Sequence, residues 1–337
     1  MSPGDLPALA EVLRRNGLAG KREHPFPNDG WSGASMTLLH RGSERFVLKR
    51  DSLAADWIAR ATNDGPVLRE AWFAANGPRL PAPLRGPYLG VGRDGDMFGI
   101  LMPDLTGVLF DWDKPISTEQ LERVLGGLAE LHGYPWMLSG ELAPDAGWCP
   151  LLERSTLICR SSLERPGPAH DAVADRLLPG WDAWDRLATP GARDVIAALS
   201  SDPQPLIESL QAQPATLIHG DLKLANVGIE ADGSIVMVDW QMVMLAPIAV
   251  ELGWFLVSNV ASLPLPPDEV IARYRGLGVA TFDDDGVDAA ILVGLLLRGW
   301  RKGVDAEADI SLASGVSARD DLAWWCERAV EAADRLL

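Results

Sequence analysis

The sequence has few cysteines and no long apolar run. Cys149, Cys159 and Cys326 are the three cysteines among 337 residues, and their wide spacing fits neither a zinc site nor a disulfide framework. One of the longest apolar runs, residues 289–297, is too short to cross a bilayer, and residues 1–5 are too polar to begin a signal peptide. We therefore expect a cytoplasmic protein that does not enter the membrane.

The sequence is also short of positive charge. It holds 30 Lys and Arg against 47 Asp and Glu, which gives a formal net charge of −17. Such a chain repels the phosphates of nucleic acid, so we expect no nucleic-acid partner. The acidic balance is compatible with a cationic small molecule. The length allows a large core, and we expect two lobes rather than two independent domains.

The most informative residues lie between positions 217 and 241. His219, Asp221 and Asn226 form the pattern H-x-D-x-x-x-x-N, and Asp239 follows thirteen residues after Asn226, at the end of an apolar run. Phosphoryl transfer from a nucleotide needs a carboxylate that orients the attacking hydroxyl, and oxygen ligands that hold Mg²⁺ on the phosphates. This segment supplies both kinds of group.

A hairpin explains the spacing of these residues. Asp232-Gly233 between two apolar runs is a strong hairpin signal. Such a hairpin places Asn226 and Asp239 at the same end, where one metal ion can contact both. The alternative, in which His219 and Asp221 only cap a turn, is less favoured because the whole set of residues occurs together.

The segment resembles the catalytic loop of the aminoglycoside phosphotransferase and choline kinase family, which is related to the protein kinases. HGDLKLANV matches the family's H-G-D-x-x-x-x-N, and VDWQ matches its metal-binding segment. The resemblance implies that Asp221 is the catalytic base, that Asn226 and Asp239 bind Mg²⁺, and that His219 braces the loop. The family more often has an acid where this chain has Gln241, so Gln241 receives no metal role.

Two further positions follow from the same resemblance. Lys223 stands where many antibiotic kinases have His, and it is either a catalytic cation that reaches the transferred phosphate or a solvated loop residue. Glu251 stands where the family usually has an Asp that accepts backbone hydrogen bonds from the catalytic loop.

A kinase-like small lobe also needs a Lys for the nucleotide phosphates and a Glu that holds this Lys. Residues 45–50 alternate like a strand and contain Lys49. Residues 67–73 read as a helix and contain Glu70, twenty-one positions later. We predict an ion pair between Lys49 and Glu70, while the neighbouring Arg69 is expected to point elsewhere.

Two more segments are expected to contact the nucleotide. Residues 28–37 form a turn-rich stretch between the first strands, in which Gly33 and Ser35 could donate backbone hydrogen bonds to phosphate. After the predicted strand 97–102, the resemblance implies a hinge that binds the adenine edge. Its members in this chain are Leu101, Met102 and Asp104.

The expected fold is α+β, with the two lobes of a protein-kinase-like fold. Residues 1–103 form the N-terminal nucleotide-binding lobe, a five-stranded antiparallel sheet with one helix and a glycine-rich turn at 90–95. Residues 104–337 form the mainly helical C-terminal lobe, which begins with a helix at 118–132 capped by Ser117. Residues 134–215 form a helical insertion.

The walls of the acceptor site are expected in this insertion and in the helices after residue 285. The acids Asp283–Asp285 and Asp288 would suit a polyamine, and the many large-lobe tryptophans would suit sugar rings, although most of them are expected in the core. Arg298 interrupts an apolar helix. We favour a structural ion pair for it over a contact with substrate.

The predicted reaction moves the γ-phosphate of ATP or GTP to a hydroxyl of a small molecule. The favoured acceptor is an aminoglycoside or another sugar-bearing antibiotic, and the alternative is a sugar, amino sugar or amino alcohol of metabolism. A non-catalytic pseudokinase is less favoured because Lys49, Asp221, Asn226 and Asp239 are all intact. The short segment between Asp239 and Glu251 leaves too little room for the activation loop of a protein kinase.

Overall fold

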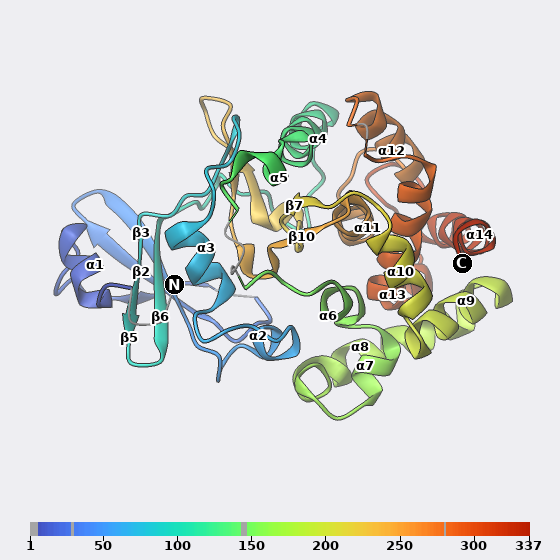
Figure 1. Cartoon of the computed structure of the whole chain (residues 1–337), viewed down its shortest axis with the longest axis horizontal. Coiled ribbons are helices and arrows are strands. Elements are labelled where there is room, and N and C mark those ends of the chain that lie inside the picture. Colours follow the sequence, from blue (N-terminus) through green and yellow to red (C-terminus); the bar gives the residue numbers. More distant parts are fainter. Residues whose placement is uncertain (1–5, 28–29, 143–146, 280) are drawn as a thin grey trace.

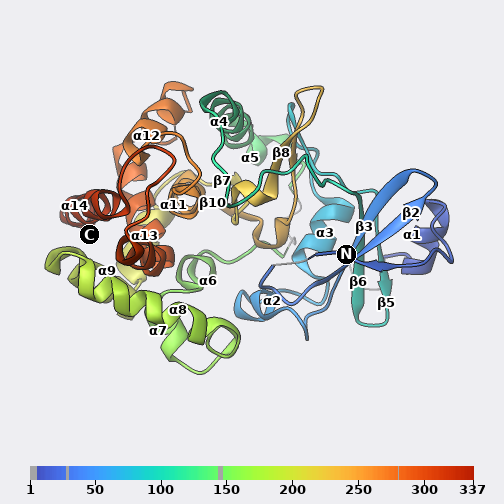
Figure 2. The same cartoon turned by 180° about the vertical axis from the view of Figure 1, so that it is seen from behind.

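The computed structural model describes residues 6–27, 30–142, 147–279 and 281–337. An antiparallel sheet with three helices forms one end of the molecule, and a larger, mainly helical part forms the other (Figures 1 and 2). The expected α+β fold with two lobes is confirmed.

The sheet of the small lobe has the strand order β1-β2-β3-β6-β5, and every neighbouring pair is antiparallel. The central strand β3 places Lys49 opposite Met36 on one side and Ile100 on the other. The strands are β1 (His24–Pro25), β2 (Ser35–Arg41), β3 (Glu44–Asp51), β5 (Gly90–Asp94) and β6 (Met97–Pro103).

Two expectations for this lobe were wrong. Gly90–Asp94 is a strand rather than a turn; its glycines make room for α1, because a Cβ on Gly92 would lie 2.7 Å from Leu9 Cα. The lobe also has more than one helix. They are α1 (Leu9–Arg15), α2 (Trp57–Ala61) and α3 (Arg69–Asn76), which carries Glu70.

The large lobe begins with α4, and Ser117 caps it as predicted: Ser117 Oγ accepts from Gln120 N, and Gln120 Oε1 accepts from Ser117 N. The insertion at 134–215 is mostly helical. The helices of this lobe are α4 (Thr118–Gly133), α5 (Trp136–Ser139), α6 (Leu151–Thr156), α7 (Arg160–Glu164), α8 (Pro168–Leu187), α9 (Pro190–Ser201), α10 (Gln204–Gln211), α11 (Ile248–Asn259), α12 (Pro267–Gly276), α13 (Asp284–Ala308) and α14 (Ala318–Leu336).

Short strands between the lobes hold the segment 217–241 in place. Strand β7 (Thr216–Ile218) pairs with β10 (Met244–Ala246), and β8 (Val227–Ile229) pairs with β9 (Ile235–Met237) as the predicted hairpin. Strand β4 (Leu84–Arg85) runs parallel to β9, so a segment from the first 103 residues joins the hairpin. The single-turn helices η2 (Leu224–Asn226) and η3 (Trp240–Met242) follow β7 and β9.

Glycines let the central helices of the large lobe approach closely. A Cβ on Gly253 of α11 would lie 2.3 Å from Ala290 O of α13, and one on Gly303 of α13 would lie 2.3 Å from Trp184 N of α8. Helix α13 is kinked at Arg298, whose φ and ψ are −136° and 20°.

Across the described ranges, no helix is both long and apolar enough to cross a membrane. Most tryptophans of the large lobe are buried in the core, as expected. The fully buried ones are Trp136, Trp181, Trp184, Trp240 and Trp325.

Candidate active site

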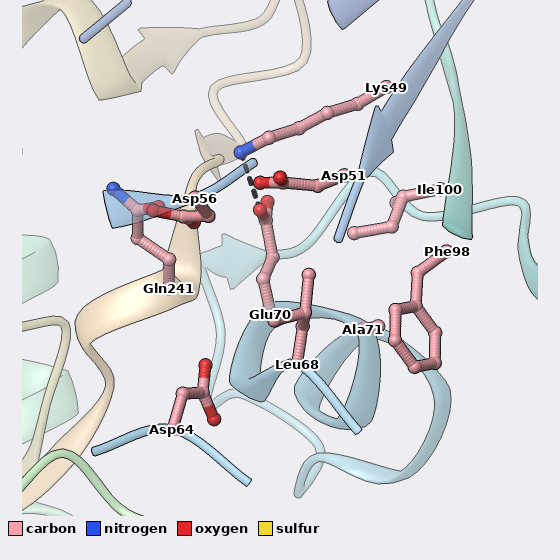
Figure 3. Close-up of a pocket in the computed structure, with 10 residues that line it drawn as sticks. All are labelled: Lys49, Asp51, Asp56, Asp64, Leu68, Glu70, Ala71, Phe98, Ile100 and Gln241. Carbon is pink, nitrogen blue, oxygen red and sulfur yellow. Dashed lines mark hydrogen bonds and ion pairs between the residues drawn. The ribbon is translucent and has the colours of Figure 1, made fainter. Parts of the chain in front are cut away.

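Lys49 lies at the junction of the two lobes and contacts two carboxylates. Its Nζ lies 2.5 Å from Glu70 Oε2 on α3 and 2.7 Å from Asp239 Oδ1 after β9. Figure 3 shows the Lys49 ammonium directed at Glu70, with Asp51 and Asp56 nearby. The predicted ion pair is therefore present, and Asp239 joins it from the large lobe.

Burial and the neighbouring charges shift the pKa values of these groups. Burial opposes the charge of Lys49, but Asp239 and Glu70 outweigh burial and raise the pKa of Lys49 above its usual value. Burial likewise opposes the charge of Asp239, and the charges of Lys49 and Lys223 lower its pKa. For Asp51, burial and then the charge of Asp56 raise the pKa to about 8. Lys49 is thus held as a cation among buried acids.

Asp239 and Asn226 meet at the same end of the hairpin, as predicted. Val238 N donates to Asn226 O at 3.0 Å, and Asp239 adopts the left-handed conformation with φ 66°. Asn226 Nδ2 donates to Asp221 O at 2.8 Å, so its Oδ1 remains available, as does Asp239 Oδ2. A metal ion between these oxygens fits the donor set that Mg²⁺ prefers. No group of three or more His, Cys, Asp or Glu in the described ranges could hold a metal by itself, so phosphate oxygens would complete the coordination.

The catalytic loop places Asp221 beside Lys223. Lys223 Nζ lies 3.0 Å from Asp221 Oδ2, and the Lys223 side chain is partly exposed. Gly220 is required at its position because its φ is +80° and a Cβ would lie 2.0 Å from Met242 O. The sequence H-G-D therefore fits a tight backbone approach to the segment after Asp239.

His219 and Glu251 brace this loop. His219 Nε2 donates to Val238 O at 2.9 Å, while its Nδ1 accepts from Asp221 N at 3.3 Å. Glu251 Oε2 accepts from His219 N at 2.6 Å, and its Oε1 accepts from Gly220 N at 3.1 Å. Burial opposes the charge of Glu251, but the nearby His132 and His219 lower its pKa. The longer Glu thus makes the contacts expected of the family's Asp.

Arg69 links the two lobes, which the sequence did not suggest. Its side chain is buried, its Nη1 donates to Gln241 O at 2.7 Å, and its Nη2 donates to Thr62 O at 3.2 Å. As expected, Arg69 points away from the Lys49–Glu70 ion pair. The neighbouring Glu70 and Arg69 thus both tie α3 to the segment around Asp239.

The segments expected around the nucleotide lie at the ends of strands, before β2 and after β6. Gly33 has φ +108°, and a Cβ there would lie 2.4 Å from Ala55 O; Ser35 begins β2 and is exposed. Residues 28–29 of the predicted loop lie outside the described residues.

The predicted hinge follows β6. Leu101 is fully buried in the sheet and Met102 is nearly so, so their side chains belong to the core of the lobe. Asp104 pairs with Arg45 at 2.7 Å and caps Thr106 N at 3.0 Å. Asp104 therefore shapes the turn, while a contact between this backbone and adenine stays a prediction.

The comparison with protein families decides which kind of protein this is. Residues 25–289 match the model of the phosphotransferase enzyme family. This chain belongs to that family. The expectation of an ATP-dependent phosphotransferase with a hydroxyl acceptor is confirmed at the level of the family.

Solved structures resemble this phosphotransferase over nearly the whole chain, at low identity. A spectinomycin phosphotransferase in complex with ADP and spectinomycin has 17% identity and a TM-score of 0.49, with 97% of this chain and 96% of that one covered. A choline/ethanolamine kinase family protein from Mesorhizobium loti has 14% identity and a TM-score of 0.46, with 96% of each chain covered. No curated protein matches the chain.

On its large-lobe side, the catalytic loop of this phosphotransferase contacts an arginine that the sequence did not single out. Arg154 on α6 is fully buried and donates through Nε to Gly220 O at 2.5 Å. Its guanidinium lies over Trp254 on α11, 4.4 Å from the ring centroid, and Arg298 lies 5.2 Å from the same indole. The two arginines thus share one aromatic ring near Asp221.

The expectation of a structural ion pair for Arg298 was wrong. Across the described ranges, Arg298 forms no ion pair, and its buried Nε has no hydrogen-bond partner. The nearby acid Asp305 is taken by Arg301 at 2.8 Å, so the kinked segment of α13 keeps an uncompensated cation.

The acidic residues at the start of α13 are instead paired. Asp283 caps the helix through Gly286 N at 3.0 Å, and Asp284 pairs with Arg275 at 2.7 Å. Asp288 accepts two hydrogen bonds from Arg335, at 2.6 and 2.7 Å. This end of α13 lies against α12 and α14, and its acids are largely neutralised (Figure 1).

Proposed function

We propose that this phosphotransferase moves the γ-phosphate of Mg²⁺-bound ATP to a hydroxyl of a small molecule, with Asp221 as the catalytic base. The convergence of Lys49, Asp221, Asn226 and Asp239 at the lobe junction carries this proposal. Strand β3 brings Lys49 to Asp239, and within the segment 221–239 the Asn226 side chain bonds the Asp221 backbone. A protein without catalytic activity would have no need of all four.

Each residue of the set has a separate role. Lys49 binds phosphate oxygens of the nucleotide, and Glu70 keeps it in place. Asn226 and Asp239 would hold Mg²⁺ through side-chain oxygens, and the metal would neutralise charge on the phosphates. The expected nucleotide contacts of Gly33, Ser35, Leu101, Met102 and Asp104 belong to the same proposal.

The transfer itself involves one proton and one phosphoryl group. Asp221 accepts the proton of the acceptor hydroxyl as the hydroxyl oxygen forms a bond to the γ-phosphorus. The bond between that phosphorus and the bridging oxygen breaks, and ADP leaves with the bonding electrons. Lys223 would offset the charge of the moving phosphoryl group, a role supported by its position 3.0 Å from Asp221 Oδ2.

The acceptor approaches from the large lobe, because the nucleotide occupies the side of Lys49. A sugar-bearing antibiotic and a metabolic sugar, amino sugar or amino alcohol are the two candidate classes. Arg154 and Arg298 near Asp221 repel a polyamine, so an aminoglycoside is the less favoured acceptor. We also propose a cytosolic location, in keeping with three buried cysteines that are all free.

A coupled assay of ADP release tests this proposal. Wild-type enzyme with Mg·ATP is offered a panel of sugars, amino alcohols, sugar acids, sugar phosphates and antibiotics, and the products are checked for a new phosphoester by mass spectrometry. We expect acceptor-dependent ADP release that requires Mg²⁺. Nucleotide binding without phosphoester formation on any member, while added protein substrates are phosphorylated, would overturn it.

A further inference from the structure

Two arginines near the catalytic base have charges that no described carboxylate offsets through an ion pair. Arg154 is fully buried, and its Nη2 has no hydrogen-bond partner. Arg298 is partly buried, and its Nε has none either. In the ranges that the structure describes, neither guanidinium lies within 4 Å of an acid. A buried charge without a partner is costly, so such a pair calls for a ligand.

The groups around the arginines are donors. Trp254 Nε1 and Trp300 Nε1 are both buried, and neither has a hydrogen-bond partner among the residues that the structure describes. Arg298 lies 5.2 Å from the centroid of each of these rings, so both indoles belong to its surroundings. Arginine and indole N–H groups can only donate, and a cluster of donors with net positive charge favours an anion.

The backbone at Arg298 is also irregular. Its φ of −136° breaks the helical conformation within α13, and Gly299 follows directly. Burial and then the charge of Arg301 lower the pKa of Arg298 to about 10, although the charges of Asp221 and Asp305 act in the opposite direction. The kink thus carries a cation that forms no ion pair with any residue the structure describes.

The position of the arginines separates them from the nucleotide phosphates. The charge of Asp221 acts on both guanidiniums. Lys49, whose Nζ lies 2.7 Å from Asp239 Oδ1, comes instead from β3 of the small lobe. Arg154 and Arg298 come from α6 and α13 of the large lobe, the side that the acceptor occupies in the proposed function.

We propose that Arg298, assisted by Arg154, binds an anionic group of the acceptor, so that the enzyme phosphorylates a hydroxyl compound bearing a carboxylate or a phosphate. This inference rests on the proposed function and narrows its acceptor class. Arg298 is the contact residue because it is partly exposed. Arg154 also holds Gly220 O, so its replacement would disturb the catalytic loop and is unsuitable as a test.

Calorimetry with a simple anion tests the site without knowledge of the acceptor. The nucleotide site is first filled with Mg·AMP-PNP, and inorganic phosphate or acetate is then titrated into the complex. We expect the anion to bind the wild type. Its affinity for Arg298→Met should be lower by about 10- to 100-fold, because this variant lacks one charged hydrogen-bonding partner. Arg186→Met is the control, since Arg186 on α8 is exposed and pairs with Glu307 on α13. It should bind as the wild type does.

Turnover of matched acceptors gives the second measurement. Glucose is compared with gluconate and with glucose 6-phosphate, and glycerol with glycerate and with glycerol 3-phosphate. A preference for the acids indicates a carboxylate, and one for the phosphate esters indicates a phosphate. Arg298→Met should raise KM for the anionic members by about 10-fold or more and leave neutral members unchanged.

The outcomes separate this inference from the proposed function. Anion binding that is equal in Arg298→Met and the wild type, or absent from the AMP-PNP complex, would overturn the anion site while leaving nucleotide-dependent transfer untouched. The anion site would also be overturned if the enzyme phosphorylated a polyamine efficiently and phosphorylated no anionic acceptor. Failure of the proposed function would instead show as loss of Mg·ATP binding or of all Asp221-dependent transfer.

Discussion

The nucleotide side and the acceptor side of Asp221 treat buried cations in opposite ways. On the nucleotide side, Lys49 contacts Glu70 and Asp239 and lies among further acids, so its charge is more than balanced (Figure 3). On the acceptor side, Arg298 has no ion pair with any residue the structure describes. Protein carboxylates therefore balance the buried cation on the first side, and the proposed anion site would balance the cation on the second.

Lys49→Met should cause the largest change in stability. It leaves Glu70 and Asp239 buried without their cation, and breaking such a pair costs about 3–5 kcal/mol. Urea denaturation at pH 7 measures the free energy of unfolding, and calorimetry measures Mg·ATP affinity. Both should fall.

Lys302→Met is the matched control for Lys49→Met. Lys302 is equally buried and pairs with Asp321 at 2.7 Å, far along α13 from the nucleotide side. It should lose stability and keep Mg·ATP affinity. An unchanged Mg·ATP affinity in Lys49→Met would remove Lys49 from the nucleotide site.

Asp51→Asn tests the excess of acids around Lys49. The pKa of Asp51 is raised to about 8, so the folded protein keeps a proton on this carboxyl that the unfolded chain loses near its ordinary value of 3.8. The contribution of Asp51 to the free energy of unfolding is therefore fully present below about pH 4 and is lost as pH rises toward 8. Over this range the free energy falls by up to about 1.4 kcal/mol per pH unit.

The measurement for Asp51→Asn is the free energy of unfolding between pH 5 and 9, compared with the wild type. The variant should lack this part of the slope and gain relative stability as pH rises. Asp284→Asn, an exposed acid paired with Arg275, should retain the wild-type slope. Parallel curves for wild type and Asp51→Asn would show that Asp51 does not hold a proton.

Arg298→Met should cause the smallest change in stability. Because Arg298 has no ion pair to lose, its replacement removes an uncompensated charge and fills the space with an apolar chain. We expect the free energy of unfolding to stay the same or rise. A loss as large as that of Lys49→Met would mean that Arg298 has a structural partner, and the comparison between the two sides would fail.

The sequence predicted the nucleotide side better than the acceptor side. Lys49, Glu70 and the hairpin from Asn226 to Asp239 were found because their chemistry depends on order and spacing along a few strands and one helix. The sequence did not single out Arg154, because its contact with the catalytic loop forms only when α6 packs beside that loop. Arg298 stood out as a charge in an apolar helix, but its lack of a partner depends on how Arg301 and Asp305 pair in the fold.

Other differences have similar causes. The strand at Gly90–Asp94 reads as a turn because the sequence does not reveal that α1 excludes side chains there. The acids at the start of α13 read as an open cluster because their partners, Arg275 and Arg335, come from neighbouring helices. Local pattern predicted the elements, while the pairing of charges between distant elements required the structure.

The most direct test of the account separates nucleotide binding from phosphoryl transfer at Asp221. Asp221→Ala should keep Mg·ATP affinity within about 2-fold in calorimetry and lose at least about 10²-fold in single-turnover transfer, because the base touches the acceptor rather than the nucleotide. Asp239→Asn, measured beside it, should weaken Mg·ATP binding itself, since an amide brings no charge to the metal. Wild-type transfer by Asp221→Ala would contradict the account.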